Sequence, residues 1–337
     1  MITQKKMLTV GLASSALFNL SEGDRIFREQ GVDAYAQYQL DNEEDILAPG
    51  IALPFIRRLL KLNDLATDEP LVKVILLSRN NINTGLRVMN SLEAYGIDIS
   101  QAHFLQGGSP VEFIDALGID LFLSGHELDV RRVLSNGYAA GQCLESEYVD
   151  ETDDNELRLA FDFDGVLADD ESECVYQCSK SLAEFHSHEM INSGVAHNPG
   201  PLKSFLNKVY QIQQIEQKLA EENLNYNTRL NIALVTARTA PAHKRVINTM
   251  RAWNLHPNKA FFMGGAEKTA VLSQYKPHMF FDDQRVHLDR SSAVAPAVHV
   301  PFGKLNKLAS ERQIDRPKFV GASENKVLGE RSNFYCA

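Results

Sequence analysis

The sequence contains few cysteines, no long apolar run and no excess of basic residues. Its four cysteines include one close pair, Cys174 and Cys178, whose spacing fits neither a disulfide framework nor a zinc site. No run of roughly 18 apolar residues occurs, so we expect no membrane span. Acidic residues outnumber basic residues by 44 to 34, for a net charge of -10, which disfavours nucleic acid as a partner. These absences favour a cytoplasmic protein.

The length and composition are those of a folded, globular protein. A chain of 337 residues can form about two compact units of roughly 150 residues. Short apolar runs alternate with amphipathic stretches, which is typical of parallel strands joined by helices. We therefore predict an α/β fold with a parallel sheet, whose strands would be MLTVGLA, LVKVILL, IDLFL, LRLAF, LNIALV and HMFF.

The two halves of the chain resemble each other. A shift of 158 residues, from Val74 to Ile232, places VILLSRN on IALVTAR and RVMNSLEAYGI on RVINTMRAWNL. Upstream, a shift of 149, from Val10 to Leu159, places VGLASSALF on LAFDFDGVL. Strands and loops stay in register, so we expect two copies of one α/β unit, with a longer insertion in the second.

An acidic segment, ESEYVDETDDNE, lies between the two copies. A run of like charges is typical of a solvated linker. We predict an N-terminal unit, a linker, a second unit that contains the insertion, and a C-terminal tail. These cover residues 1–146, 147–156, 157–303 (insertion at about 168–229) and 304–337.

Polar residues follow the apolar strands of the second copy, at the edge where open parallel sheets bind ligands. Each has an alternative structural role: Thr236 could cap a turn, Lys268 could be a solvated helix residue, and an Asp pair could begin a helix. Taken together they are suited to phosphoryl transfer. The set is Asp162, Asp164, Thr236, Lys268, Asp282 and Asp283.

A carboxylate can attack phosphorus and hold it as an aspartyl phosphate, which divides one difficult step into two. A second Asp, two residues further along an extended segment, can then act as acid and base. Its pKa, ordinarily about 3.9, would have to be raised by neighbouring carboxylates. Lys268 and a magnesium ion would neutralise the phosphate charge. Thr236 and nearby backbone amides, including that of Ala237, would bind its oxygens.

Five segments resemble a known family: FDFDGVLADDESE, NPGPLKSF, LVTART, RVINTMRAWNL and PHMFFDDQRVH. The order of DFDGV, a strand-terminal Thr, a Lys and a DD pair is similar to that of the haloacid dehalogenase (HAD) superfamily. More narrowly, the segments resemble the cytosolic 5'-nucleotidase I family, from about residue 7 to Gly303. The resemblance implies two tandem HAD-like (Rossmannoid) units, the second catalytic with a helical cap. It also implies hydrolysis of AMP and related nucleoside monophosphates with Mg²⁺.

The resemblance further implies a role for each site residue. Asp162 would be the nucleophile and Asp164 the acid and base, while Thr236 and Lys268 would bind phosphate. The family often has DGDAV where this chain has DFDGV, which leaves the fine substrate preference open. Two alternatives remain: a phosphatase for another small phosphomonoester, and a nucleotide sensor without activity. Mg²⁺ would be bound by Asp162, the Asp164 carbonyl and one of Asp282 or Asp283.

The first copy lacks this chemistry, because uncharged residues stand at every corresponding position. We expect this unit to be structural and to pack on the second copy, although Ser78, at the Thr236 position, leaves a vestigial anion site as an alternative. The uncharged residues are Ala13, Ser15, Pro110, Ser124 and Gly125.

The insertion at about 168–229 reads as helices that would cover the site and exclude water. Its aromatic residues Tyr176, Phe185 and Tyr210 could stack on a base, although their apolar spacing also fits a core position. A homo-oligomer is compatible with the sequence, although no segment specifically predicts one.

Overall fold

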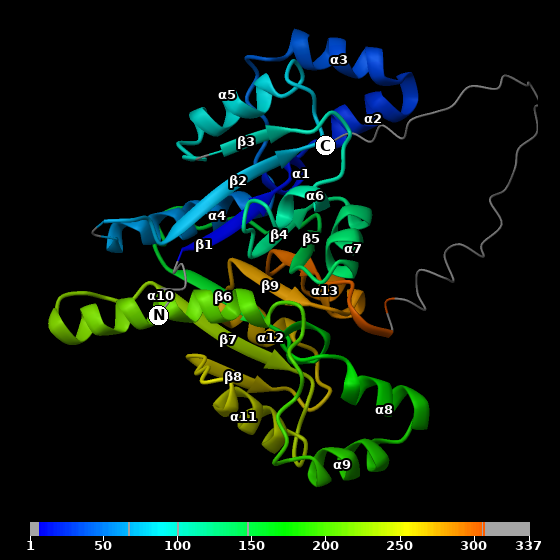
Figure 1. Cartoon of the computed structure of the whole chain (residues 1–337), viewed down its shortest axis with the longest axis vertical. Helices are drawn as coiled ribbons and strands as arrows, with labels where there is room; N and C mark the ends of the chain where they lie inside the picture. The colour runs from blue at the N-terminus through cyan, green and yellow to red at the C-terminus, as the bar shows by residue number, and fades with distance from the viewer. Residues whose placement is uncertain (1–6, 67, 100, 147, 305, 307–337) are drawn as a thin grey trace, which may run out of the picture.

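The computed structural model describes residues 7–66, 68–99, 101–146, 148–304 and 306. The described residues form one ten-stranded sheet with helices on its faces (Figure 1), in the order β3-β2-β1-β4-β5-β10-β9-β6-β7-β8. The predicted α/β class is confirmed. The strands are β1 (Leu8–Leu12), β2 (Val72–Ser78), β3 (Gln101–Phe104), β4 (Leu121–Ser124), β5 (Ala140–Cys143), β6 (Leu157–Phe161), β7 (Leu230–Thr236), β8 (Lys259–Phe262), β9 (Met279–Asp282) and β10 (Ala297–His299).

Each half of the chain contributes five neighbouring strands in the same order. In the first half this order is β3-β2-β1-β4-β5, and in the second it is β8-β7-β6-β9-β10. Within each half the described neighbours are parallel, whereas β10 runs antiparallel to β5 and pairs Val298 with Cys143 and His299 with Gln142. The edge strands β5 and β10 thus join two similar halves into a single sheet.

The helices of the two halves also correspond. Helices α2 and α3 follow the first strand of one half, and α8 and α9 follow the first strand of the other; both pairs lie on the right in Figure 1. The helices are α1 (Ser14–Leu17), α2 (Ser21–Gln30), α3 (Val32–Asp41), α4 (Ala52–Leu60), η1 (Lys61–Leu65), α5 (Leu86–Ala94), α6 (Val111–Ile114), α7 (Glu127–Ser135), η2 (Phe163–Leu167), α8 (Glu171–Ser179), α9 (Leu182–Ile191), α10 (Lys203–Glu222), α11 (His243–Ala252), α12 (Thr269–Tyr275) and α13 (Arg285–Ser291).

Several tertiary contacts occur once in each half at corresponding positions. An isolated bridge joins Phe18 to Pro49 in the first half and Ala168 to Pro199 in the second. Three long-range hydrogen bonds repeat in the same way. The assignment of the two halves to HAD-like units stays a prediction. The repeated bonds are Arg87 Nε to Asp45 O and Arg245 Nε to Val195 O; Asn90 Nδ2 to Glu43 O and Asn248 Nδ2 to Ser193 O; and Leu47 N to Ser91 Oγ and His197 N to Thr249 Oγ1.

The largest hydrophobic cluster of the described residues contains side chains from both halves, such as Leu12 and Phe55 together with Phe161 and Phe205. Helix α4 contacts β2 and β6, and α10 contacts β1 and β7, so each of these helices packs on strands of both halves. The halves therefore share a core, and the boundaries predicted for them stay a prediction.

The acidic segment is anchored to the folded chain. The guanidinium of Arg58 is 3% exposed and lies 2.8 Å from an oxygen of Asp150. It also donates to the backbone carbonyls of Glu151 and Asp154. A buried arginine with several acceptors holds this segment in place, which the run of like charges did not indicate.

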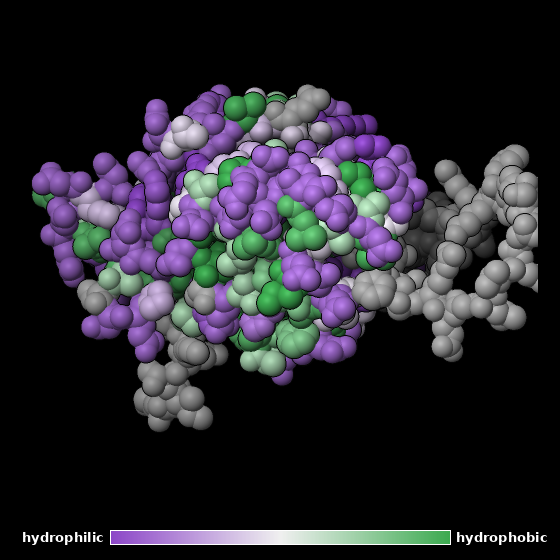
Figure 2. Space-filling view, turned by 90° about the horizontal axis from the view of Figure 1, so that it is seen from above, coloured by the Kyte–Doolittle hydropathy of each residue, from purple (hydrophilic) through white to green (hydrophobic). Residues whose placement is uncertain are grey.

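The described residues contain no membrane-spanning helix and no disulfide. Among the described helices, none is both long and apolar enough to cross a membrane. The described cysteines are free thiols. Figure 2 looks onto the end formed by the first half and shows a mainly hydrophilic surface with smaller groups of hydrophobic side chains. The predicted tail at 304–337 lies outside the described residues, apart from Lys304 and Asn306.

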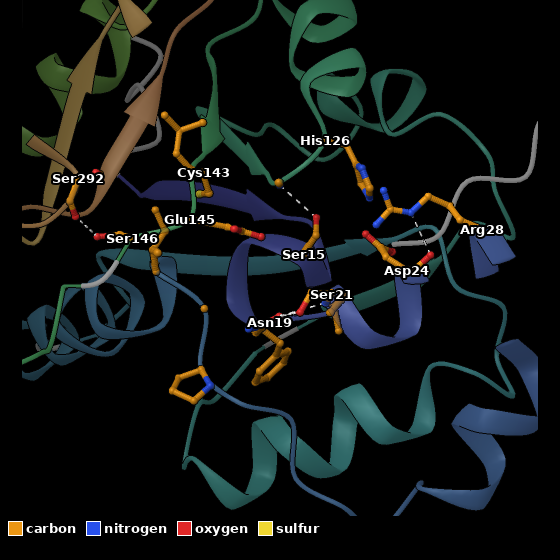
Figure 3. A pocket seen from close by; sticks show the side chains of 17 residues that line it. Ser15, Asn19, Ser21, Asp24, Arg28, His126, Cys143, Glu145, Ser146 and Ser292 are labelled. Atoms are coloured by element: carbon orange, nitrogen blue, oxygen red, sulfur yellow. Dashed lines mark hydrogen bonds between the residues drawn. The ribbon is translucent and has the colours of Figure 1, made fainter. Parts of the chain in front are cut away.

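A cavity of about 730 Å³ is lined mainly by residues of the first half. Ser15 and Gly125 line it at the carboxyl ends of β1 and β4, with Asp24 and Arg28 on one side and Ser292 on the other (Figure 3). It contains none of the predicted site residues, so it is separate from the candidate active site.

Candidate active site

The strand register places two of the predicted carboxylates at the same edge of the sheet. Phe161, the last residue of β6, is paired with Phe281 of the parallel strand β9. The next residues, Asp162 and Asp282, are both buried. Because parallel neighbours in register end together, two residues far apart in sequence lie side by side.

Lys268 joins these two carboxylates. Its Nζ atom lies 3.1 Å from Asp162 Oδ1 and 2.7 Å from Asp282 Oδ2, and its side chain is buried immediately before helix α12. Burial by itself would lower the pKa of this ammonium group, but the two carboxylates raise it. Lys268 is therefore a buried cation held at the predicted nucleophile.

The pKa of Asp162 is raised to about 7, chiefly because the carboxyl group is buried. The ammonium group of Lys268 opposes this rise, and the charges of Asp282 and Asp164 add to it. The Asp162 Oδ1 atom also accepts a hydrogen bond of 2.8 Å from the backbone N–H of Phe163. More positive charge is needed before Asp162 is fully ionised near neutrality.

Asp283 is a buried carboxylate without a counter-charge of its own. Its Oδ1 atom has no hydrogen-bond partner among the described residues. Burial, together with the charges of Asp282 and Asp162, raises its pKa well above the ordinary value. Oδ2 approaches Gly165 so closely that a Cβ atom there would lie 2.7 Å away, and Gly165 has a φ of +69°. The turn therefore requires glycine both for its conformation and for this contact.

This donor set fits a hard divalent cation. Oxygen atoms of Asp162 and Asp282 and a ring nitrogen of His287 lie within 4.8 Å of one another, and the partnerless oxygen of Asp283 belongs to the next residue. Carboxylate oxygens are the ligands that magnesium prefers. His287 Nδ1 lies 3.1 Å from Asp282 Oδ2 and was not identified from the sequence, although it follows the Asp pair in the segment DDQRVH.

The predicted phosphate-binding residues lie at the end of the neighbouring strand. Thr236 is the last residue of β7 and is buried. Its Oγ1 atom accepts a hydrogen bond of 3.2 Å from the backbone N–H of Arg238. Ala237, between them, is exposed. The hydroxyl of Thr236 therefore shapes the turn that follows the strand, and its role toward phosphate stays a prediction.

Asp164 has a different environment from the one that we expected. Instead of facing only other carboxylates, its two oxygens accept hydrogen bonds of 2.7 Å and 2.6 Å from Nε and Nη2 of Arg238. Burial, together with the charges of neighbouring carboxylates, raises the pKa of Asp162 and of Asp283. The sequence did not indicate this because Asp164 follows β6 and Arg238 follows β7, and their approach depends on the tertiary fold.

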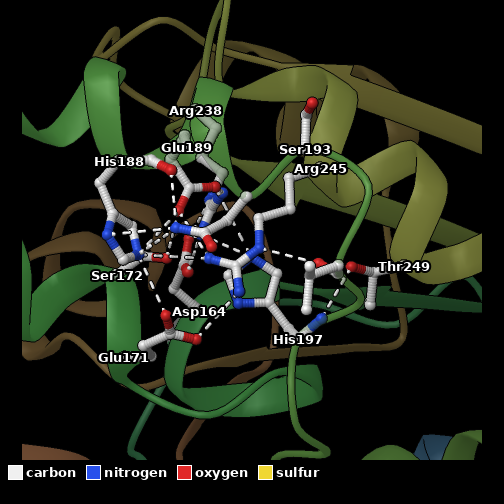
Figure 4. A network of polar contacts seen from close by, with 12 residues as sticks. Asp164, Glu171, Ser172, His188, Glu189, Ser193, His197, Arg238, Arg245 and Thr249 are labelled. Carbon is white, nitrogen blue, oxygen red and sulfur yellow. Dashed lines mark hydrogen bonds and ion pairs between the residues drawn. The ribbon is translucent and has the colours of Figure 1, made fainter.

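Arg238 belongs to a buried polar network, which Figure 4 shows. Its Nη1 atom donates to the carboxylate of Glu189 on helix α9. Glu189 is completely buried. Burial would raise the pKa of Glu189, but His197, whose Nε2 atom lies 3.6 Å from Oε2, and the charge of Arg238 lower it. Arg245 donates to the other oxygen of Glu189 over 3.0 Å. None of these residues was selected from the sequence, where isolated charges look like surface residues.

The three aromatic residues of the predicted cap lie in two places. Tyr176 and Phe185 are neighbours on α8 and α9, with ring centroids 6.5 Å apart, and Arg238 lies over the ring of Phe185. Tyr210 instead lies on α10 against His256, which precedes β8. This position is toward the amino end of β8, away from Asp162; the stacking role expected of the three aromatic residues stays a prediction.

Comparisons with known proteins identify the family of this chain. A model of the 5'-nucleotidase family matches residues 1–307. Human cytosolic 5'-nucleotidase 1B is 32% identical over an alignment of 306 residues, which covers 89% of this chain and 50% of the human protein. The chain thus spans about half the length of this curated relative. No solved structure matches the chain. Since the family match extends over nearly the whole chain, the protein belongs to the 5'-nucleotidase family.

Proposed function

We propose that the protein is a magnesium-dependent, cytoplasmic 5'-nucleotidase that hydrolyses nucleoside 5'-monophosphates, with AMP preferred. The observation that carries the proposal is the contact of buried Lys268 with both Asp162 and Asp282. Membership of the 5'-nucleotidase family supports the reaction, and the human relative, named as cytosolic, supports the location.

The first step would transfer the phosphoryl group to the protein. An oxygen of Asp162 forms a bond to phosphorus, while the bond from phosphorus to the nucleoside 5'-oxygen breaks. Asp164 gives its proton to that oxygen, and the nucleoside leaves. Lys268 lies beside the attacking carboxylate and balances the negative charge of the incoming ester.

The second step would regenerate the carboxylate. A water molecule attacks phosphorus, and Asp164, now ionised, accepts its proton. The bond between phosphorus and Asp162 breaks, which releases inorganic phosphate and leaves both Asp residues in their starting protonation states. Thr236 and the backbone N–H of Ala237 would bind phosphate oxygens in both steps.

Asp162, the carbonyl of Asp164 and one of Asp282 or Asp283 would hold Mg²⁺. The partnerless, buried oxygen of Asp283 supports this assignment, because an unpaired carboxylate at this depth is costly without a cation. When bound, Mg²⁺ supplies positive charge to phosphoryl oxygens. The same charge would favour the ionised form of Asp162 that attacks phosphorus.

The test measures phosphate released from a panel of phosphomonoesters by the purified protein with Mg²⁺. We expect AMP to be hydrolysed fastest and sugar phosphates slowly. A high rate on a sugar phosphate with little on any nucleotide would move the proposal to another substrate class.

Replacement of the nucleophile separates an enzyme from a nucleotide sensor. Asp162→Asn should abolish turnover and retain nucleotide binding measured by calorimetry. Asp289→Asn is the matched control, because Asp289 is 61% exposed on α13 and pairs only with Arg285 among the described residues. Full phosphate release by Asp162→Asn would exclude the proposed nucleophile.

A further inference from the structure

Arg238 holds the proposed acid and base by both oxygens. The Nε and Nη2 atoms donate to the two oxygens of Asp164 over 2.7 Å and 2.6 Å. A two-pronged contact between guanidinium and carboxylate fixes the plane and direction of the carboxylate, which a single hydrogen bond does not. Arg238 is 4% exposed, so water does not compete for these contacts.

The guanidinium of Arg238 is itself fixed from the other side. Nη1 donates to Glu189, and Nη2 lies 3.3 Å from Nε2 of His197. The rings of Phe163 and Phe185 lie 5.4 Å and 5.6 Å from its central carbon. Arg238 therefore has little freedom to reorient, and its placement depends on residues from helix α9.

Glu189 connects this arginine to the helices that follow the first motif. Its Oε1 atom accepts hydrogen bonds from Ser172 on α8, over 2.7 Å, and from Arg245 on α11, over 3.0 Å. Arg245 resembles Arg238 in burial and in its contact with Glu189, but its other prongs reach Glu171 and the carbonyl of Val195 rather than Asp164.

The first half provides an internal comparison. Arg87 occupies the position of Arg245 and makes the same kind of bond to a loop carbonyl, that of Asp45, so this arginine is kept where there is no catalytic Asp pair. Asn80 occupies the position of Arg238 and accepts a hydrogen bond from Tyr35. Gln39 stands in place of Glu189, and Ser15 in place of Asp164. The charged pair of Arg238 and Glu189 thus occurs only in the half with the Asp pair.

We propose that Arg238 is a positioning residue for Asp164, and that Glu189 fixes Arg238 so that the direction of the Asp164 carboxylate follows the placement of helix α9. This inference rests on the proposed hydrolysis of phosphomonoesters. It concerns proton transfer to the leaving oxygen, so its effect depends on the leaving group. A nucleoside leaves as an alkoxide that needs a proton, whereas an aryl group such as p-nitrophenol leaves without one.

The experiment compares Arg238→Lys with wild type on AMP and on p-nitrophenyl phosphate. We expect kcat on AMP to fall by at least roughly tenfold, and kcat on the aryl ester and KM for AMP to change far less. Arg87→Lys is the matched control: Arg87 is the buried arginine at the position of Arg245 in the first half, and its Nε atom donates to the carbonyl of Asp45 rather than to Glu189 or Asp164, so any change should be equal for both substrates.

Two further variants keep the test decisive. Glu189→Gln leaves the two hydrogen bonds from Arg238 to Asp164 in place but weakens the contact that holds Arg238. It should therefore lower kcat on AMP selectively, as Arg238→Lys does, but by a smaller factor. In an Asp164→Asn background, Arg238→Lys should cause no additional loss on AMP, because Arg238 acts through Asp164.

An equal loss on both substrates, or an additional loss in the Asp164→Asn background, would show that Arg238 is only structural and would overturn the inference. The proposed function fails separately, if wild-type protein hydrolyses none of the phosphomonoesters. If Arg238→Lys does not fold, as judged by circular dichroism, Glu189→Gln decides the question by the same two substrates.

Discussion

The ammonium group of Lys268 lies 3.1 Å from Oδ1 of Asp162, although helices η2 and α8 to α11 and strands β7 and β8 separate these residues in the chain. The contact brings a buried cation to the carboxylate that would attack phosphorus. A salt bridge at this depth has a mixed effect on stability, because two charges lose their hydration. Its position at the ends of adjacent strands fits the phosphoryl transfer that we propose.

Lys268→Met should lower both activity and stability. Removal of a preorganised cation from a phosphate site should reduce kcat by at least roughly a hundredfold. Asp162 and Asp282 would be left buried without their cation, which should lower the free energy of unfolding by about 3–5 kcal/mol. Phosphate release and urea denaturation measure the two effects. Lys276→Met, at an exposed lysine paired with Glu151, should change neither; an unaltered kcat in Lys268→Met would remove this residue from the site.

Asp283→Asn should separate folding from metal binding. Without metal, the variant should be more stable than wild type by about 1–3 kcal/mol, because a buried carboxylate with a partnerless oxygen becomes a neutral amide. With Mg²⁺ the difference in stability between the two proteins should become smaller or change sign, since only wild type keeps the carboxylate. Thermal unfolding with EDTA and with Mg²⁺ measures both states. If Mg²⁺ raises Tm equally in the two proteins, Asp283 is not part of the metal site.

His278 should make the protein less stable in acid. It is fully buried, its Nδ1 atom accepts a hydrogen bond from the backbone N–H of Arg158, and burial, with the charges of Arg58 and Arg158, lowers its pKa to about 3. The unfolded chain, with a His pKa of about 6.5, binds this proton more readily than the folded protein. Stability should therefore fall as the pH decreases from about 6.5 to 3, by at most about 5 kcal/mol.

In the variant His278→Asn, the free energy of unfolding should decrease less between about pH 6.5 and 3. Urea denaturation curves recorded at several pH values measure this acid dependence. His256→Asn, at an exposed histidine, serves as the control and should retain the wild-type slope. An acid limb that is the same in His278→Asn and wild type would assign the pH dependence to other groups.

A fragment lacking residues 1–146 should be insoluble or inactive. It would expose the edge of β10 that pairs with β5, and an open strand edge promotes aggregation. Helix α10 would lose its contact with β1, and Lys208 would lose Asp120, which lies 2.7 Å away. Solubility and phosphate release of the fragment measure the outcome. A soluble fragment with full activity would contradict the structural role of the first half.

The sequence determined the fold class and the main carboxylates of the candidate site. Continuous apolar runs mark buried parallel strands, and the residues directly after them lie at one edge of the sheet because such strands end together. Asp162 directly follows β6, and Asp282 is the last residue of β9, so both could be selected from the sequence. An apolar run and the residue that follows it are neighbours in the chain, so a sequence pattern can reveal both.

Only the tertiary structure decided how the halves join and what holds Asp164. Strands β5 and β10, AGQC and AVH, are short, and their antiparallel pairing depends on which edges meet when the halves pack. Arg238, which follows β7, reaches Asp164, and Glu189 on α9 holds Arg238; the long side chain of arginine gives no periodic signal. The contact of Tyr210 with His256, which precedes β8, likewise depends on how α10 packs. Such contacts depend on the packing of whole elements, which a linear pattern does not specify.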